Sequence, residues 1–364
     1  MSLIKELLEK AISLDASDIH IKPDQQPFFR VHGTLKESGF ETITPEHITE
    51  ITKDLIPKHL AGQYEAEHEA DFSFHEDGIG RFRVNVFHAQ GIPAIAMRYV
   101  KSNIPTFEEL HLPLQLRDLA RVSRGIILLS GTTGSGKSTT LAAIIDEINK
   151  TLQRRIITVE DPVEYIFQDK KSVITQREVG LDTLTFQNSL KRLMRQDPDV
   201  ILIGEMRDRV SIRTALLAAE TGHLVLSTLH AGTSALAVPR MLDVFPADEQ
   251  DQIRMGIAGN LHAIVCQRLV PDTTGNAVPA VEIMINTSTM RKLLEKNKLD
   301  LISTAIETGK EDGMQTFNQS IYDLIRKGAI TETEGMRFAT NPEALRMNLQ
   351  GIFLDEGSRI LGSV

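Results

Sequence analysis

Short apolar runs alternate with helical patterns through the middle of the chain. The runs GIILLS, IITVED, DVILIG and HLVLSTL are rich in Ile, Val and Leu, and turn residues follow each of them. Runs of this length fit strands that are buried on both faces of a largely parallel sheet. Between them, apolar residues recur at helical spacing, as at Phe186, Leu190, Leu193 and Met194. The alternation predicts an α/β domain over residues 125–289.

The first hundred residues follow a different rhythm. An apolar helix pattern precedes strand-like pieces that are separated by turn residues. Thr44 and Pro45 suit the cap and the first position of a helix, which predicts a helix over residues 45–60. We therefore expect a small α+β domain over residues 1–100.

Two further segments complete the predicted organisation. Pro105 and Pro113 interrupt any long element between residues 101 and 124, so we expect a linker and lead-in there. Near the end of the chain the pattern is helical, with Gly or Thr at the expected helix ends. This predicts a small C-terminal helical region over residues 290–364.

Composition narrows the classes of function. The 364 residues carry a net charge of -9 with a pI near 5.7, so no global positive charge favours nucleic acid or an anionic membrane. No apolar run approaches the roughly 18 residues that a membrane span needs, and the start of the chain has no signal-peptide pattern. The single cysteine, Cys266, cannot form an intrachain disulfide or a four-cysteine zinc site. These features favour a multidomain cytoplasmic protein that does not bind nucleic acid.

The segment GTTGSGKS carries a phosphate-binding motif. It matches GxxxxGK[ST] and stands directly after a strand pattern and before a helix pattern, the context that the motif requires. We expect the loop N–H groups to surround phosphate oxygens, Lys137 to reach the β and γ phosphates, and Ser138 to hold Mg²⁺. A chance match in a Gly-containing turn is the alternative, and both flanks argue against it. The predicted ATP-binding residues are Gly131, Thr132, Thr133, Gly134, Ser135, Gly136, Lys137, Ser138 and Thr139.

Carboxylates follow two of the predicted strands. Glu205 follows DVILIG at the position of a Walker B acid, and Glu160, Asp161 and Glu164 lie at and after the end of IITVED. Open α/β sheets place ligands at these strand ends, and hydrolysis needs carboxylates to organise the metal and orient water. Ser138 and Glu205 are the predicted metal contacts. A pair of solvated acidic loops is the alternative, and the motifs leave open which carboxylate is the catalytic base.

Two histidines bracket another predicted strand, in ETGHLVLSTLHAG. His230 follows a strand that we expect beside the phosphate-loop strand, where groups that sense the γ-phosphate lie. A structural histidine fits the pattern equally well. His230 is therefore a candidate contact of the nucleotide or its water, and His223 is its companion at the start of the run.

Three arginines form a small basic cluster in the first domain. Arg81, Arg83 and Arg98 fall on neighbouring predicted strands. A solvated cationic strand face would explain them. Our hypothesis is that these arginines are delivered to the triphosphate of a neighbouring subunit.

Four segments, in this order, resemble the Walker A motif, Asp box, Walker B motif and His box of the secretion ATPase superfamily. They are GTTGSGKSTT, TVEDPVEY, LKRLMRQDPDVILIGEMRD and TGHLVLSTLHA. Within the superfamily, the chain resembles the type IV pilus retraction ATPases, the PilT and PilU group. It lacks the four-cysteine site and the longer N-terminal region usual in assembly and secretion ATPases, and GMQTFNQSIYDLIRKG also resembles the retraction group. The resemblance implies a PAS-like N-terminal domain joined to a RecA-like ATPase domain, assembled as a homohexamer.

The resemblance also implies roles for the candidate residues. Glu205 matches the Walker B acid, Glu160 and Glu164 match the Asp box glutamates, and His223 and His230 match the His box pair. The three arginines fall where the family's N-terminal arginines reach across a subunit boundary. The implied function is hydrolysis of ATP with Mg²⁺, which drives motion between the domains and, through an inner-membrane platform protein, withdraws pili during twitching motility. The motor would act at the cytoplasmic face of the inner membrane, with a paralogous pilus ATPase as a further candidate partner.

Several alternatives stay open. The segment TMRKLLEKNK, Thr289 to Lys298, stands where the retraction group has AIRNLIRE, so the chain could be a principal motor, an accessory motor or a divergent paralogue. Other interpretations are a pilus assembly or type II secretion ATPase, a nucleic-acid translocase, and a regulatory subunit that binds ATP without hydrolysing it. The acidic balance and the lack of Trp argue against the translocase.

Overall fold

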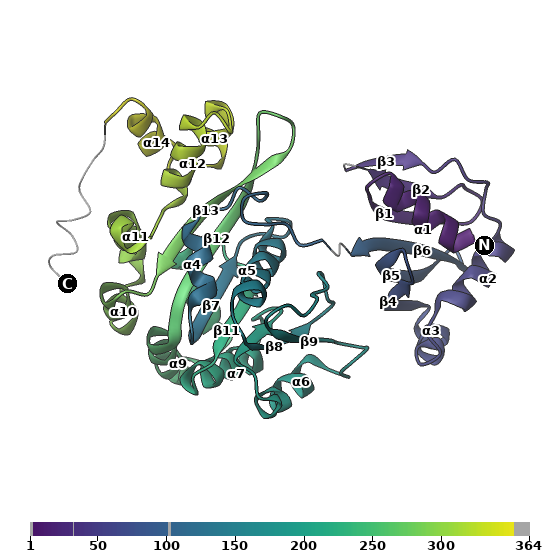
Figure 1. Ribbon diagram of the computed structural model, residues 1–364, viewed down its shortest axis with the longest axis horizontal. Helices are drawn as coiled ribbons and strands as arrows, with labels where there is room; N and C mark the ends of the chain where they lie inside the picture. The colour runs from purple at the N-terminus through teal and green to yellow at the C-terminus, as the bar shows by residue number, and fades with distance from the viewer. Residues whose placement is uncertain (1–2, 32, 101–102, 353–364) are drawn as a thin grey trace. The chain divides into compact units, whose positions relative to one another are not determined.

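A computed structural model describes residues 3–31, 33–100 and 103–352, which form two compact units (Figure 1). The first unit contains Met1–Asn103 together with Pro162–Ile166 and Glu178–Leu184, and the second contains the rest of the chain. Residues 101–102 of the expected linker and 353–364 of the expected C-terminal region lie outside the described residues. The chain has the predicted mixed α/β fold class.

The first unit is built on a six-stranded antiparallel sheet of order β3-β2-β1-β6-β5-β4. Its strands are β1 (Ala16–Ile21), β2 (Phe28–Val31), β3 (Thr34–Glu37), β4 (Glu69–Glu76), β5 (Gly80–Ala89) and β6 (Ile92–Val100). Its helices are α1 (Leu3–Ser13), α2 (Pro45–Leu55) and α3 (Ala61–Glu67).

One face of this sheet packs against helices, and the opposite face carries polar side chains. On β5, Phe82, Val84 and Val86 are fully buried in a core that α1 and α2 complete. Because successive strand residues point to opposite faces, Arg81 and Arg83 lie on the other face. The candidate arginines of the first unit therefore share the face away from its core.

Helix α2 begins as predicted and ends earlier than predicted. The Thr44 hydroxyl accepts a hydrogen bond from the backbone N–H of His47, which caps the helix. The helix stops at Leu55 instead of continuing to residue 60, because Ile56 is extended in front of Pro57. A residue before proline is disfavoured in the helical region, and this steric effect overrides the apolar pattern beyond it.

The second unit is built on a seven-stranded sheet of order β13-β12-β7-β11-β10-β8-β9. The five strands from β12 to β8 are parallel to their neighbours, and β13 pairs antiparallel with β12. The strands are β7 (Gly125–Ser130), β8 (Arg155–Glu160), β9 (Val173–Glu178), β10 (Val200–Ile203), β11 (Leu224–Leu229), β12 (Leu261–Pro271) and β13 (Ala277–Ile285). The last residue of β9 is grouped with the first unit.

Helices surround this sheet and continue to the end of the described chain (Figure 1). The α-helices are α4 (Gln115–Asp118), α5 (Lys137–Thr151), α6 (Phe186–Leu193), α7 (Arg209–Glu220), α8 (Ser234–Leu242), α9 (Ala247–Asn260), α10 (Ser288–Glu295), α11 (Ile302–Thr308), α12 (Phe317–Arg326), α13 (Glu332–Phe338) and α14 (Pro342–Leu349). Short 3₁₀ turns are η1 (Leu119–Arg121), η2 (Met194–Gln196), η3 (Leu299–Leu301) and η4 (Lys310–Asp312). The predicted C-terminal helices are present and belong to the second unit.

The segment expected to be a linker and lead-in belongs to the second unit from Ile104 onward. Phe107, Leu112 and Leu116 are buried in one cluster with Ile144 and the sheet. The two prolines do interrupt long elements, but the apolar side chains between them contribute to the core. Burial of these side chains, at about 1.5–3 kcal/mol each, outweighs the lack of regular structure.

Among the described residues, no helix is both long enough and apolar enough to cross a membrane.

Candidate functional site

Four parallel strands of the second unit end at the same edge of the sheet. In register, Ser130 at the end of β7 pairs with Leu229 of β11, and Ile203 of β10 pairs with Val159 of β8. The residues that follow these strand ends therefore lie along one edge. They include the phosphate loop, His230, Glu205 and Glu160, which the sequence predicted to lie together.

The phosphate loop depends on glycine at both of its ends. Gly131 has φ +148°, and a Cβ there would lie 2.5 Å from the Gln267 carbonyl oxygen and 2.6 Å from Ser135 Oγ. Gly136 has φ +84°, and its Cβ would lie 2.7 Å from Gln267 Nε2. Real Cβ atoms do not approach other atoms this closely. At Gly131 the backbone would have to shift, and at Gly136 the left-handed φ also strains any other residue.

Helix α5 begins inside the motif, at Lys137. Its cap residue is Gly136, which offers no side-chain acceptor to the first N–H groups of the helix. These N–H groups and the helix dipole favour an anion at this end. Ser138 and Thr139 lie half-buried in the first turn, whereas Thr132 and Thr133 are exposed at the loop tip.

The ammonium group of Lys137 lies across this loop. Its Nζ donates to the carbonyl oxygens of Gly131 and Thr132, at 2.9 Å each, and the residue is 8% exposed. A phosphate oxygen would exchange these neutral acceptors for a charged one, and charge-assisted hydrogen bonds are about twice as strong. The lysine is thus already beside the position that the motif assigns to phosphate.

Glu205 and His230 meet at the ends of two neighbouring strands. His230 Nε2 lies 3.6 Å from Glu205 Oε1, and the side chains of the histidine and the glutamate are 42% and 35% exposed. The Thr228 hydroxyl donates to the Gly204 carbonyl at 2.7 Å, which ties the two strand ends together. A Cβ at Gly204 would lie 3.2 Å from the Val159 carbonyl oxygen, so glycine allows β8 and β10 to pack closely just before Glu205.

Glu160 is more enclosed than Glu205. It is 8% exposed, and its Oε1 accepts hydrogen bonds from Thr158 Oγ1 at 2.6 Å and from Gln176 Nε2 at 3.3 Å. Asp161 follows it, exposed, with Oδ2 3.7 Å from Arg207 Nη2. Glu205 is more exposed than Glu160, and it lies beside His230, whereas the exposed Asp161 lies beside Arg207.

His223 lies at the opposite edge of the sheet from its own phosphate loop. It precedes Leu224, which pairs with Gly125 at the start of β7, and its Nδ1 is 2.9 Å from the Ala218 carbonyl oxygen. The resemblance assigns both histidines to one His box, but within this chain a strand of six residues separates them. Within one chain only His230 lies at the phosphate-loop edge.

The remaining candidates, Glu164 and the three arginines, belong to the first unit. Arg81 Nη2 is bound to Glu178 Oε2 at 2.5 Å, and Glu178 also accepts from Ser73 Oγ, also at 2.5 Å. Arg98 Nε donates to Asp18 Oδ1 at 2.8 Å. Arg83 is exposed and pairs across the strands with Arg98. The structure therefore brings the three arginines together on one sheet face of the first unit.

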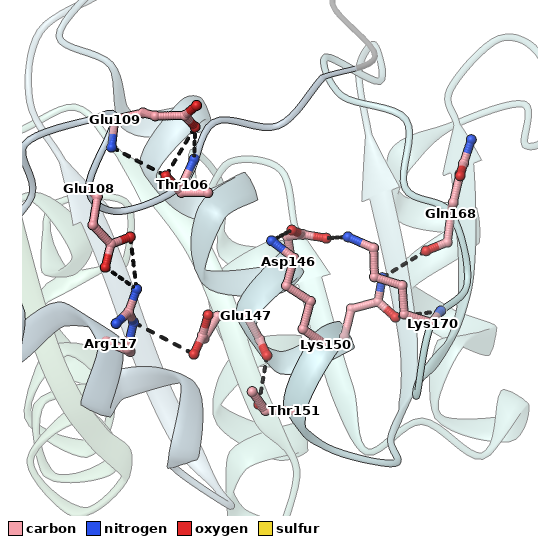
Figure 2. A network of polar contacts seen from close by, with 11 residues as sticks. Thr106, Glu108, Glu109, Arg117, Asp146, Glu147, Lys150, Thr151, Gln168 and Lys170 are labelled. Atoms are coloured by element: carbon pink, nitrogen blue, oxygen red, sulfur yellow. Dashed lines mark hydrogen bonds and ion pairs between the residues drawn. The ribbon is translucent and has the colours of Figure 1, made fainter.

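A polar network anchors the outer side of the helix that carries Lys137. Figure 2 shows Arg117 between two glutamates: its Nη2 donates to Glu108 Oε1 at 2.7 Å, and its Nε lies 3.6 Å from Glu147 Oε1. In the same view Asp146 of α5 accepts from Lys150 at 2.6 Å and from Lys170 at 2.5 Å. These contacts hold the C-terminal half of α5, the end away from the phosphate loop.

Sequence reasoning missed two residues that support the site. Gln267 of β12 is 3% exposed and packs behind the phosphate loop. The Ser130 hydroxyl donates to the Ala231 carbonyl at 2.8 Å and accepts from the Ala231 N–H at 3.0 Å, which connects the loop to the residue after His230. Neither residue belongs to a sequence motif. Their places beside the phosphate loop follow only from the pairing of β7 with its neighbouring strands.

Comparisons with known proteins find similar sequences and a similar fold. The model of the family described as Type II/IV secretion system protein matches residues 1–293. The chain is 39% identical to the "Type IV pilus retractation ATPase PilT" of Pseudomonas aeruginosa, over 93% of this chain and 99% of that protein. It is also 39% identical to "Type IV pilus ATPase PilU" of the same organism, over 95% and 91%. A crystal structure of the pilus retraction motor PilT with bound ADP matches with a TM-score of 0.87 and 41% identity, covering 94% of this chain and 98% of that one.

Proposed function

Because the chain belongs to the Type II/IV secretion system protein family, we propose that it is an ATP-hydrolysing motor that retracts type IV pili. One observation carries this proposal: the likeness to PilT extends over nearly the whole chain, in sequence and in fold, and includes a phosphate loop of the required geometry. The matching crystal structure is that of a pilus retraction motor with bound ADP. That one structure therefore supports both parts of the proposal, the binding of an adenine nucleotide and the role in retraction.

Nucleotide binding is assigned to the phosphate loop. The loop N–H groups and the first turn of α5 would bind the β-phosphate, with Lys137 moving from the loop carbonyls to the phosphate oxygens. Gly131 and Gly136 provide the curvature that brings the backbone close to the ligand. Thr139 would complete the contacts at the α-phosphate side of the helix start.

Hydrolysis is assigned to Glu205, with His230 beside it. Glu205 is the partly exposed carboxylate at the strand edge, so it can orient an attacking water. His230 can sense the γ-phosphate through the same water or oxygen. Glu160, buried and hydrogen-bonded, suits a supporting role in which it keeps the strand ends and their waters in order.

The residues at this edge also fit a Mg²⁺ ion. Mg²⁺ in nucleotide sites takes one or two protein oxygens together with phosphate and water oxygens. The hydroxyl of Ser138, in the first turn of α5, and the carboxylate of Glu205 are oxygen donors of this kind. When bound, the ion would neutralise charge that develops on the phosphates.

The proposed motor is a homohexamer in which one subunit completes the site of another. Arg81, Arg83 and Arg98 would supply cations to a neighbour's triphosphate, the role of an arginine finger. Glu164 and His223 would act at the same subunit boundary, since His223 is far from the phosphate loop of its own chain. The hydrolysis cycle would change the angle between the two units of each chain.

The working partner is proposed to be a platform protein of the inner membrane, reached from the cytoplasmic side. The chain is 39% identical both to PilT and to PilU of Pseudomonas aeruginosa, so an accessory role beside a second pilus ATPase is the nearest alternative. Retraction is the direction named for PilT, and we carry it to this chain on the strength of the likeness.

The test combines turnover and pilus function. Purified wild type, Lys137→Ala and the exposed-lysine control Lys171→Ala are compared for steady-state ATP hydrolysis, with native mass measured in the same buffer. We expect a hexamer that hydrolyses ATP in wild type and control, and no turnover in Lys137→Ala. Nucleotide binding without turnover in wild type would favour a regulatory subunit.

In cells, the deletion strain separates the mechanical alternatives. Loss of twitching with pili retained, rescued by wild type and not by Lys137→Ala, supports retraction. Loss of pili supports an assembly motor and contradicts the proposed direction. Normal twitching that fails only under high load would indicate an accessory motor.

A further inference from the structure

Gln267 lies directly behind the phosphate loop, on a strand that no nucleotide motif includes. Strand β12 runs parallel to β7, and Cys266 pairs with Ser130. Residue 267 is therefore beside Gly131, the first residue of the loop. The side chain is nearly completely buried, at 3% exposure.

The side-chain amide of Gln267 contacts both the helix and the loop. Thr140 Oγ1 donates a hydrogen bond to Gln267 Oε1 at 2.8 Å, and Thr140 is itself 1% exposed. The backbone N–H of Thr140 donates to the Gly136 carbonyl at 3.0 Å, which closes the first turn of α5. The amide nitrogen of Gln267 lies against the Cα of Gly136, so closely that a Cβ there would be 2.7 Å away.

The backbone of the same residue limits the other end of the loop. The carbonyl oxygen of Gln267 lies against Gly131, where an added Cβ would be 2.5 Å from it. One residue of β12 thus contacts both glycines that begin and end the turn around the phosphate. Neither contact needs a nucleotide to be present.

We infer that Gln267 is a positioning residue that holds the phosphate loop in its nucleotide-binding curve before ADP or ATP arrives. The inference rests on the proposed function, because it concerns the same nucleotide. A site made of backbone N–H groups binds tightly only if their directions are fixed in advance, since ordering them on binding costs free energy. Gln267 fixes them through the amide on Gly136 and the hydrogen bond from Thr140.

The chemistry of the residue suits this place. A buried amide needs a hydrogen-bond partner, and Thr140 supplies one from the helix that must stay in register with the loop. Methionine would fill a similar volume without accepting that bond. Glutamate would add a negative charge behind the phosphates, which a nucleotide site disfavours.

The experiment measures ADP binding by calorimetry, in Mg²⁺ buffer, for the full-length protein. Gln267→Met removes the acceptor of the hydrogen bond between these residues, and Thr140→Val removes its donor. Thr140→Ser keeps the hydroxyl and is the matched control. We expect ADP affinity to fall about five- to tenfold in each of the first two variants and to stay near wild type in Thr140→Ser. The double variant should bind ADP no more weakly than either single variant, because both substitutions remove the same hydrogen bond.

Steady-state kinetics then separates positioning from catalysis. KM for ATP should rise with the loss of ADP affinity, while kcat falls less than about twofold, since Glu205 and His230 are unchanged. Gln267→Glu should bind ADP more weakly than Gln267→Met.

Three results would overturn the inference. These are wild-type ADP affinity in both Gln267→Met and Thr140→Val, additive losses in the double variant, and a fall in kcat at unchanged affinity. If Gln267→Met does not unfold cooperatively, Thr140→Val and Thr140→Ser carry the test. If wild type itself binds no ADP, the proposed function fails first, and that result is distinguishable because it appears before any variant is compared.

Discussion

His230 Nε2 and Glu205 Oε1 lie 3.6 Å apart, although the two residues follow different strands of the sheet. Strands β10 and β11 are adjacent and parallel, so their last residues meet at one edge. The Thr228 hydroxyl and the Gly204 carbonyl hold the two ends in register. The carboxylate to which we assign the attacking water thus lies beside the histidine proposed to sense the γ-phosphate.

Glu205→Gln should abolish most turnover while nucleotide binding remains. We expect kcat to fall at least about 100-fold, because the amide keeps the shape of the side chain but loses its capacity as a base. His230→Ala should lower kcat less, since it removes the proposed sensor of the γ-phosphate and leaves the carboxylate of Glu205. Phosphate release and ADP calorimetry are measured side by side, with the exposed Glu220→Gln as control. Wild-type kcat in Glu205→Gln would remove this residue from catalysis.

Arg83→Ala should inactivate the motor without affecting the fold of its unit. Arg83 is exposed, whereas Arg81 and Arg98 are held by Glu178 and Asp18, so truncating Arg83 disturbs the fewest contacts. Loss of an arginine finger costs about 1,000-fold or more in turnover. The thermal midpoint should stay at the wild-type value.

Mixed oligomers test whether this arginine acts between subunits. Arg83→Ala and Lys137→Ala protomers are each inactive alone, but in a mixture the second can supply its arginine to the intact phosphate loop of the first. Partial recovery of ATPase activity is expected after subunit exchange. If activity stays at the level of the separate variants, the arginine serves its own chain or none.

Asp146→Ala should destabilise the second unit. This carboxylate is 5% exposed on α5 and accepts from Lys150 and Lys170 (Figure 2). Both lysines are about two-fifths exposed, so water can solvate their ammonium groups in the variant and the ion pairs contribute only modestly to stability. We expect the free energy of unfolding to fall by about 1–2 kcal/mol in urea titrations followed by circular dichroism. The exposed Asp300→Ala should leave it unchanged, and equal effects of both variants would contradict the assignment.

Glu282→Gln should change how stability depends on pH. Burial raises the pKa of Glu282, although hydrogen bonds from Ser234 and the charge of Arg268 partly oppose this. The folded state therefore holds the proton more tightly than the unfolded chain, whose glutamates have a pKa of about 4.3. Wild type loses stability as pH rises above that value. Glutamine accepts the hydrogen bond from Ser234 without a charge. The free energy of unfolding of the variant should therefore exceed that of wild type at pH 8 and not at pH 4. A difference that is constant with pH would argue against a buried charge at this position.

The sequence predicted the elements whose signal is local. Periodicity identified the central strands, and the glycine motif placed the phosphate loop correctly between β7 and α5. Glu205 and His230 could be brought together because parallel strands end at one edge. The fold class and the family followed from these motifs.

Other features depend on contacts that no local pattern records. Gln267 matters because β12 happens to lie beside β7, and the sequence of β12 contains no sign of that neighbour. Pro105 and Pro113 predict a linker and lead-in around Phe107, but no local pattern shows that the apolar side chains between them are buried in the core of the second unit. The resemblance pairs His223 with His230 in one His box, although β11 places them at opposite edges of the sheet within the chain. In each case the deciding interaction joins residues that are distant along the chain.

The sole thiol of the protein makes it a natural background for site-directed labelling. Cys266 is completely buried between strands, and burial raises its pKa far above the range in which thiols react. Maleimide dyes and thiol-specific spin labels should therefore not react with the folded wild-type chain. Introduced cysteines, one in each unit, could be labelled without first removing a native residue. A dye pair placed this way would follow the distance between the two units in real time as ATP is consumed.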